Sequence, residues 1–124
     1  MAELVGAFAA SHAPLIARDW HLFPEDLKAR FTSGFQALGR SLKAARPDVV
    51  IVVAPDHWNN FFLDNLPSIC IGVGASNDGP PELFMRDFPL KELPGHAGLG
   101  MHLLESALAR GFEPSLSHRL VLDH

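Results

Sequence analysis

The stretch "DVVIVVAPDH", residues 48–57, limits the possible folds of this chain more than any other. A continuous β-branched run of this kind is typical of a strand that is covered on both faces, as in a parallel sheet. We therefore expect a buried strand over 48–55. In folds built on such sheets, ligands bind at the carboxyl ends of the strands. The acid and the histidine that follow this run, Asp56 and His57, are therefore candidates for a functional site.

Hydrophobic spacing predicts the other elements. Apolar residues three and four apart predict a helix over 23–47, bounded by Pro24 and Pro47. The remaining expectations are buried strands over 3–11 and 68–74, a loop-rich segment over 75–95, a helix over 96–111 and a final segment, 113–124, that ends as a strand. This order predicts an α/β fold: a single domain with a mostly parallel (mixed) sheet flanked by helices.

Composition narrows the class of protein. The chain has 124 residues, 48% of them hydrophobic, which suits one modest domain with a core. The formal net charge is -4 and no basic stripe is present, which argues against nucleic acid as the main partner. One cysteine, Cys70, forms no internal disulfide, as expected of a cytoplasmic protein. The sequence contains neither a basic leader nor an apolar run of about 20 residues, so we expect no membrane span.

Three apolar runs end in a histidine: His12, His57 and His124. If the three strands are parallel neighbours, these imidazoles meet at one edge of the sheet. Neutral imidazole binds Fe(II) and Zn(II), and an unligated histidine transfers protons near neutral pH. The alternative for each is a hydrogen-bonded loop residue, and that alternative is favoured for the other four histidines, His21, His96, His102 and His118; His96 is also a candidate helix cap.

Polar and aromatic residues accompany these histidines. Asp56 and Asp123 directly precede His57 and His124, and we expect them to orient neighbouring groups, with turn capping as the alternative. The stretch "WNNFF" supplies amides and aromatic walls that suit a planar aromatic ligand. Its predicted substrate-binding residues are Asn59, Asn60 and Phe61. The alternative is that the aromatic residues are core.

The stretches "SHAPLI", "VVIVVAPDHWNNFFLDNLPSICIGVGA" and "LVLDH" together closely resemble the class III (LigB-type) extradiol ring-cleavage dioxygenases. The resemblance runs from about residue 5 to the last residue and implies Fe(II) held by two histidines and one glutamate. By motif, His12 and His57 match the two histidine ligands. His124 matches an active-site histidine that contacts substrate and takes part in proton transfer. The implied substrates are a catechol and dioxygen.

The chain also departs from the family. The family's glutamate ligand lies in a C-terminal half, and no glutamate of this sequence matches a ligand motif. We therefore expect residues 1–124 to be the N-terminal part of the dioxygenase catalytic domain, truncated, with self-association or a complementary segment covering its sheet edge. One alternative is a non-catalytic binding or scaffold protein on the same fold, like the Memo-type proteins. Another is a zinc-dependent hydrolase with a similar histidine crevice.

Overall fold

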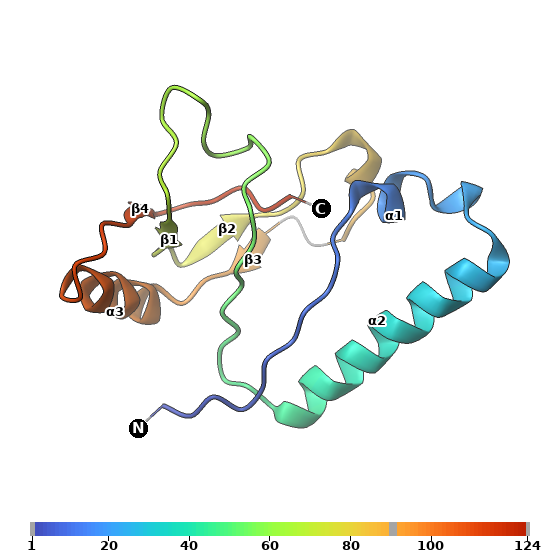
Figure 1. Cartoon of the computed structure of the whole chain (residues 1–124), viewed down its shortest axis with the longest axis horizontal. Coiled ribbons are helices and arrows are strands. Elements are labelled where there is room, and N and C mark those ends of the chain that lie inside the picture. Colours follow the sequence, from blue (N-terminus) through green and yellow to red (C-terminus); the bar gives the residue numbers. More distant parts are fainter. Residues whose placement is uncertain (1, 90–91, 124) are drawn as a thin grey trace. The chain divides into compact units, whose positions relative to one another are not determined.

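The computed structural model describes residues 2–89 and 92–123. These residues form two compact units, which meet in sequence between Val52 and Val53 (Figure 1). The first unit is mostly helical, and the second contains all the strands together with one long helix.

The helix α2 (Glu25–Ala45) dominates the first unit and confirms the helix predicted over 23–47. Glu25 and Asp26 lie in its first turn, where negative charge stabilises the positive end of the helix dipole. The helix ends at Arg46, whose backbone is left-handed with a φ of 47°, and Pro47 prevents further helical hydrogen bonding. The sequence signals therefore located both ends correctly.

Two short elements precede α2 and were not predicted. They are the helix α1 (Pro14–Arg18) and the 3-10 turn η1 (Trp20–Leu22). The ring of Phe23 lies 6.0 Å from that of Trp20 and 6.0 Å from that of Phe31 on α2. These aromatic contacts fold the turn back onto the first part of α2. Elements of this length carry too few residues for a periodic pattern.

The second unit is organised around a parallel strand pair. The strand β1 (Cys70–Gly72) pairs with β4 (Ser115–Ser117), in a register that sets Cys70 opposite Ser115. The helix α3 (Ala97–Leu108) contacts β1. Val73 and Leu104, the buried hydrophobic residues among those described, are 3% and 5% exposed. The strand predicted over 68–74 and the helix predicted over 96–111 are both confirmed.

The first turn of α3 is capped by His96. Its imidazole Nδ1 accepts a hydrogen bond from the backbone N–H of Leu99, at 3.0 Å. One of the unpaired N–H groups of the first turn is thereby satisfied. The predicted capping role of His96 is confirmed.

The segment predicted as loop-rich also holds a hairpin. Strand β2 (Ser76–Asp78) pairs antiparallel with β3 (Glu92–Pro94), and the 3-10 turn η2 (Leu83–Met85) lies between them in sequence. The prediction missed these strands because three-residue strands show no alternation and the surrounding Gly and Pro residues resemble loop. With parallel pairing at β1–β4 and antiparallel pairing at β2–β3, the α/β class with mixed pairing is confirmed.

The predictions of strands over 3–11 and 48–55 were wrong. Neither range contains strand in the structure, and Val52 and Val53 are 72% and 93% exposed. β-Branched residues favour extended backbone, but a strand also needs hydrogen bonds from a neighbour. Within the described chain, no named strand pairs with either run.

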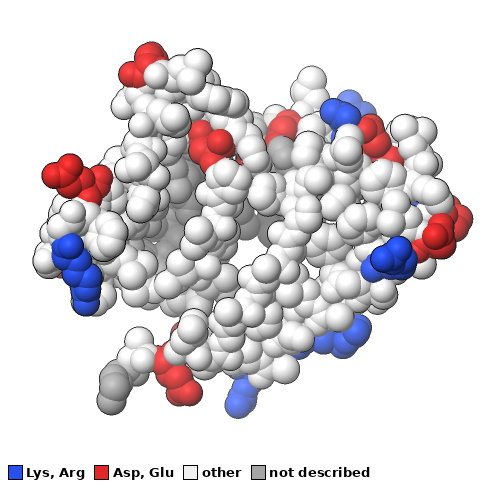
Figure 2. Space-filling view, in the orientation of Figure 1, with Lys and Arg blue, Asp and Glu red and all other residues white. Residues whose placement is uncertain are grey.

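The surface carries no concentration of positive charge on the face drawn in Figure 2, where basic and acidic side chains are scattered among uncharged ones. This distribution agrees with the formal net charge of -4. None of the helices described is both long enough and apolar enough to pass through a lipid bilayer.

The close packing of α3 on β1 generates a prediction. A Cβ added at Gly100 would lie 2.6 Å from the carbonyl oxygen of Gly72, whereas one at Gly98 would meet nothing nearer than 3.7 Å. We expect Gly100→Ala to lower the free energy of unfolding by about 1–3 kcal/mol, because backbone must shift. Gly98→Ala on the same helix is the control, expected to be neutral or to stabilise by up to about 1 kcal/mol. Urea denaturation measures both, and equal stability of the two variants would contradict this packing.

The ion pair between Asp78 and Arg119 generates a second prediction. The Arg119 guanidinium donates two hydrogen bonds to the Asp78 carboxylate, one of them from Nε at 2.8 Å. These hydrogen bonds lower the pKa of Asp78, because they outweigh the opposite effect of desolvation. A lowered pKa contributes stability that is complete above the unfolded value of about 3.9 and is lost as pH falls through the folded value. We expect the stability difference between the wild type and Asp78→Asn to shrink below about pH 4.

Urea denaturation over a pH series measures this difference. Asp64→Asn, which removes an exposed carboxylate elsewhere in the second unit, is the control. A difference between wild type and Asp78→Asn that does not change with pH would contradict the ion-pair explanation.

Candidate functional site

A histidine and an aspartate that are far apart in sequence meet in the second unit. His57 Nδ1 lies 2.8 Å from Asp123 Oδ2, and Asn59 Nδ2 donates to the same oxygen at 2.7 Å. The Asp123 side chain is 13% exposed and that of His57 is 36% exposed. An ionised carboxylate only accepts hydrogen bonds, so the donor in this contact is the His57 Nδ1–H. In a neutral imidazole that donates from Nδ1, the lone pair is on Nε2, the atom that would bind a metal.

Of the two carboxylates expected to orient neighbouring groups, Asp56 and Asp123, the one in contact with His57 is Asp123. Metal-binding histidines in proteins commonly donate their second ring N–H to a carboxylate, which fixes the tautomer and the ring orientation. Asp123 makes this contact with His57, whereas its neighbour in sequence, His124, lies outside the described residues. Asp123 therefore sits where a residue that orients His57 should be.

The other carboxylate, Asp56, caps its own turn. It accepts hydrogen bonds from the backbone N–H groups of Asn60, at 3.1 Å, and Phe61, at 3.0 Å, and from Asn60 Nδ2 at 2.7 Å. Partial desolvation would raise the pKa of Asp56, but these hydrogen bonds, together with one from the backbone of Trp58, outweigh it and lower the pKa. The contacts of Asp56 are those of the turn-capping alternative.

The Asn60 side chain connects this turn to the chain before Asp123. Its Oδ1 accepts from the backbone N–H of Val121 at 2.7 Å, and its Nδ2 donates to the Val121 carbonyl at 2.8 Å. Sequence reasoning assigned Asn59 and Asn60 to substrate binding. The structure places the amide groups of both in contacts with residues 121–123, and their contact with substrate stays a prediction.

The aromatic residues of this turn lie at its surface. Trp58 and Phe62 are 51% and 54% exposed, so neither is core among the described residues, and Phe61 is half-buried. Trp58, Phe62, Leu63 and Asp64 line a cavity of about 430 Å³. Trp58 has a φ of 64°, a left-handed conformation that costs a non-glycine residue about 1 kcal/mol or more. A strained aromatic residue directly after His57 fits a functional turn better than a packing role.

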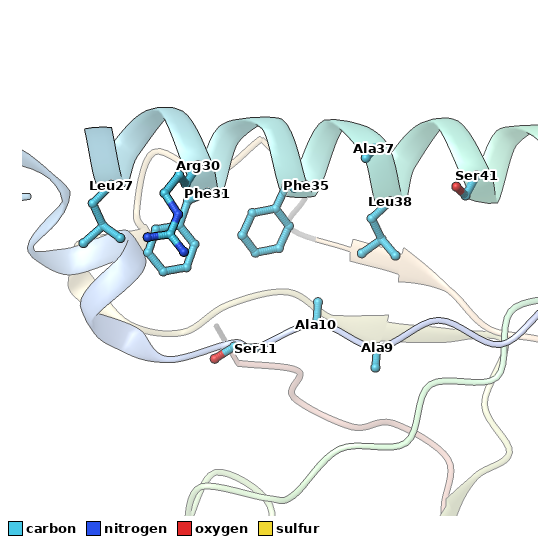
Figure 3. Close-up of a pocket in the computed structure, with 11 residues that line it drawn as sticks. Ala9, Ala10, Ser11, Leu27, Arg30, Phe31, Phe35, Ala37, Leu38 and Ser41 are labelled. Carbon is cyan, nitrogen blue, oxygen red and sulfur yellow. The ribbon is translucent and has the colours of Figure 1, made fainter. Parts of the chain in front are cut away.

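A larger cavity, of about 590 Å³, lies in the first unit and contains none of the predicted site residues. One wall of the cavity is α2 and the opposite wall is the extended segment 9–11. Figure 3 shows that the α2 side chains directed toward this segment are those of Leu27, Phe31, Phe35 and Leu38. The lining is mostly apolar, and Phe35 is still 44% exposed. We interpret this cavity as loosely packed core under the apolar stripe of α2.

The structure describes His12 apart from His57 and does not describe His124. His12 lies in the first unit, exposed, at the end of the extended segment that precedes α1. His57 lies in the second unit, so the convergence of these two imidazoles stays a prediction, as does the role of His124. Among residues 2–89 and 92–123, no three His, Cys, Asp or Glu side chains are grouped as a metal site would need.

Sequence reasoning missed the partners that hold this site together. Nothing in the sequence indicates that Asn60 contacts the backbone of Val121, 61 residues away, because the contact uses main-chain groups that every residue has. The sequence did indicate the clustering of Asp, His and Asn over 56–60, and Asp123 as a carboxylate that orients a neighbouring group. It did not indicate that this neighbouring group is His57.

Comparison with known proteins agrees with the site motifs. Residues 6–124 match the family described as the catalytic LigB subunit of aromatic ring-opening dioxygenase. A 2,3-dihydroxyphenylpropionate/2,3-dihydroxicinnamic acid 1,2-dioxygenase of Cupriavidus necator is 40% identical over 92 residues, which are 72% of this chain and 27% of that protein. The Rhodococcus globerulus enzyme of the same name is 30% identical over 115 residues, 92% of this chain and 34% of that protein.

The chain therefore spans between about a quarter and a third of the length of these relatives. No solved structure shows significant similarity to it. The family match covers nearly the whole chain and includes the turn that carries His57 and the segment that carries Asp123. On this ground the chain belongs to the LigB family, the catalytic subunits of aromatic ring-opening dioxygenases.

Proposed function

We propose that this chain contributes the histidine ligands of a non-haem Fe(II) extradiol dioxygenase, which opens a catechol-type ring with dioxygen. The observation that carries the proposal is the contact of His57 Nδ1 with Asp123 Oδ2 at 2.8 Å, in a segment that matches the LigB family. The two relatives described above are 2,3-dihydroxyphenylpropionate/2,3-dihydroxicinnamic acid 1,2-dioxygenases. A catechol with a short acidic side chain is therefore the substrate class we propose.

The donor atoms suit the proposed metal. Imidazole nitrogen is a good ligand for Fe(II), and a set of two histidines and one carboxylate leaves positions open for substrates. Asp123 holds His57 in the tautomer whose Nε2 is free of hydrogen, as a ligand must be. His12 is the second proposed ligand. The third, a glutamate in the proposed site, matches no residue of this sequence, so the proposal needs it from another segment or chain.

Each site residue that this chain supplies has a separate proposed role. When bound, the metal would lower the pKa of a coordinated substrate hydroxyl and so ease its deprotonation. His57 and His12 would hold the metal, and Asp123 would orient His57 by accepting a hydrogen bond from its Nδ1–H. His124 accepts a proton from the second hydroxyl of the catechol. Asn59 holds Asp123 by its 2.7 Å hydrogen bond.

The aromatic side chains next to His57 form the proposed rim of the substrate site. Trp58 and Phe62 line a cavity that is largely apolar, which suits the faces of an aromatic ring. Phe61 belongs to the same turn, whose backbone is held by the Asp56 carboxylate. The proposed oligomer, or a complementary segment, would complete this rim.

Replacing the proposed ligand tests the function directly. We expect His57→Ala to weaken Fe(II) binding, measured by anaerobic titration of the chain, by about 100-fold or more, since loss of an orienting partner alone costs 10- to 100-fold. The control is His102→Ala, which removes an exposed imidazole from α3 and should leave the affinity unchanged. Equal Fe(II) affinity of His57→Ala and wild type would show that His57 is not a metal ligand.

The same preparation distinguishes the other candidate functions. Once the segment or chain that supplies the glutamate is present, the Fe(II)-loaded protein, given 2,3-dihydroxyphenylpropionate and oxygen, should form a yellow ring-opened product that is followed by its absorbance. Binding of zinc in preference to iron, with no catechol oxidation, would favour the hydrolase. Absence of bound metal, together with insensitivity of any binding activity to His57→Ala, would favour the non-catalytic scaffold.

The orienting role of Asp123 gives a further prediction. Asp123→Asn keeps the size of the side chain but replaces a carboxylate with a weaker acceptor for the His57 Nδ1–H. We expect Fe(II) affinity to fall by about 10- to 100-fold, the usual effect of removing such a partner. Competition with a chromophoric chelator measures this affinity. Asp87→Asn, which removes the same charge from an exposed position in the same unit, is the matched control and should show no change.

A further inference from the structure

We infer that Asn60 is a positioning residue: its side-chain amide pairs with Val121 as the backbone of a neighbouring strand would, and this pairing holds Asp123 against His57. The inference concerns the geometry of the second unit. Only its consequence for the metal rests on the proposed function.

The segment around Val121 is paired through its backbone along one edge. The N–H of Asp78 donates to the carbonyl of Leu120 at 2.8 Å, and the N–H of Leu122 donates to the carbonyl of Asp78 at 2.9 Å. This is the hydrogen-bond pattern of a parallel bridge between Asp78, the last residue of β2, and Val121. In an extended chain the N–H and the carbonyl of one residue face the same edge, and successive residues alternate between the two edges. The N–H and carbonyl of Val121 therefore face the edge opposite Asp78.

Asn60 satisfies both of these groups. Its Oδ1 accepts from the Val121 N–H at 2.7 Å and its Nδ2 donates to the Val121 carbonyl at 2.8 Å. An amide side chain has the same donor and acceptor as a peptide group, so it can replace a strand at one position. A backbone donor and acceptor that face away from the strand pair are thereby satisfied without a further strand.

The orientation of the Asn60 amide is determined by its partners. The second hydrogen of Nδ2 is donated to Asp56 Oδ1 at 2.7 Å. If the amide were turned over, its oxygen would face a carboxylate oxygen and its NH₂ would face the Val121 N–H, so both contacts would be repulsive. Asp56 itself is held by the backbone N–H groups of Asn60 and Phe61. The turn 56–61 therefore presents Asn60 in one orientation.

This pairing sets which residue reaches His57. Two residues after Val121, at about 3.3 Å per residue, the chain places Asp123 on His57 and Asn59. A slip of one residue between the turn and this segment would present Leu122 in place of Asp123, because side chains alternate along an extended chain. Within the segment 120–123, the Asn60 amide hydrogen-bonds to Val121, so it specifies the register at that one point.

Removing the Asn60 amide tests this role in the metal-free chain of 124 residues. We expect Asn60→Ala to speed hydrogen exchange of the Val121 amide about tenfold or more, as loss of a hydrogen bond worth about 1.4 kcal/mol would. We also expect NMR of the His57 ring to show a shift from the Nδ1–H tautomer toward a mixture of the two neutral tautomers. Asn65→Ala, in an exposed position of the same unit, is the control and should change neither.

The tautomer is the decisive readout, because a purely structural role of Asn60 would loosen the segment without redirecting the His57 proton. Unchanged Val121 exchange and an unchanged His57 tautomer in folded Asn60→Ala would overturn the inference. Should that variant not fold, the unmodified chain still decides: a scalar coupling across the hydrogen bond between Asn60 Nδ2 and the Val121 carbonyl carbon is expected, and its absence would overturn the inference. Failure of the chain to bind Fe(II), with these signals present, would count against the proposed function alone.

Discussion

The candidate site depends on a short segment, 120–123, that is hydrogen-bonded along both edges. Asp78 holds one edge through its backbone, and the side chains of the turn 56–60 hold the other. Neither contact alone determines where Asp123 lies. Because the two edges are held by residues from different parts of the sequence, the geometry at His57 exists only when the second unit is folded.

The core of the second unit supports this segment from the side of β4. Strand β4 pairs in parallel with β1, and α3 approaches β1 closely because Gly100 has no side chain. At the end of β4, the hydroxyl of Ser117 accepts a hydrogen bond from the backbone N–H of Arg119, and Arg119 pairs with Asp78. The chain thus leaves the carboxyl end of a parallel strand and reaches the candidate site, which is where ligands bind in α/β folds.

The chemistry proposed for this site follows from how His57 is held. A histidine on a free turn would exchange between tautomers and orientations, and binding a metal would require ordering it. With Nδ1 held by Asp123, and Asp123 held by Asn59, the ring is ordered before any ligand arrives. The left-handed backbone of Trp58 adds to this picture, because strain in a turn is retained where the surrounding contacts fix the conformation.

The sequence by itself determined the two long helices α2 and α3, the strand at 68–74, the α/β class and the motif at 56–60, because these depend on local periodicity, on proline and glycine, and on residue type. It did not determine whether the β-branched run over 48–55 forms a strand, since a strand requires hydrogen bonds from a neighbour. Nor did it indicate which carboxylate would orient His57: Asp56 and Asp123 each precede a histidine, yet one caps a turn and the other contacts His57. Only the tertiary structure decided between them, because pairing through main-chain groups such as those of Val121 leaves no mark on residue identity.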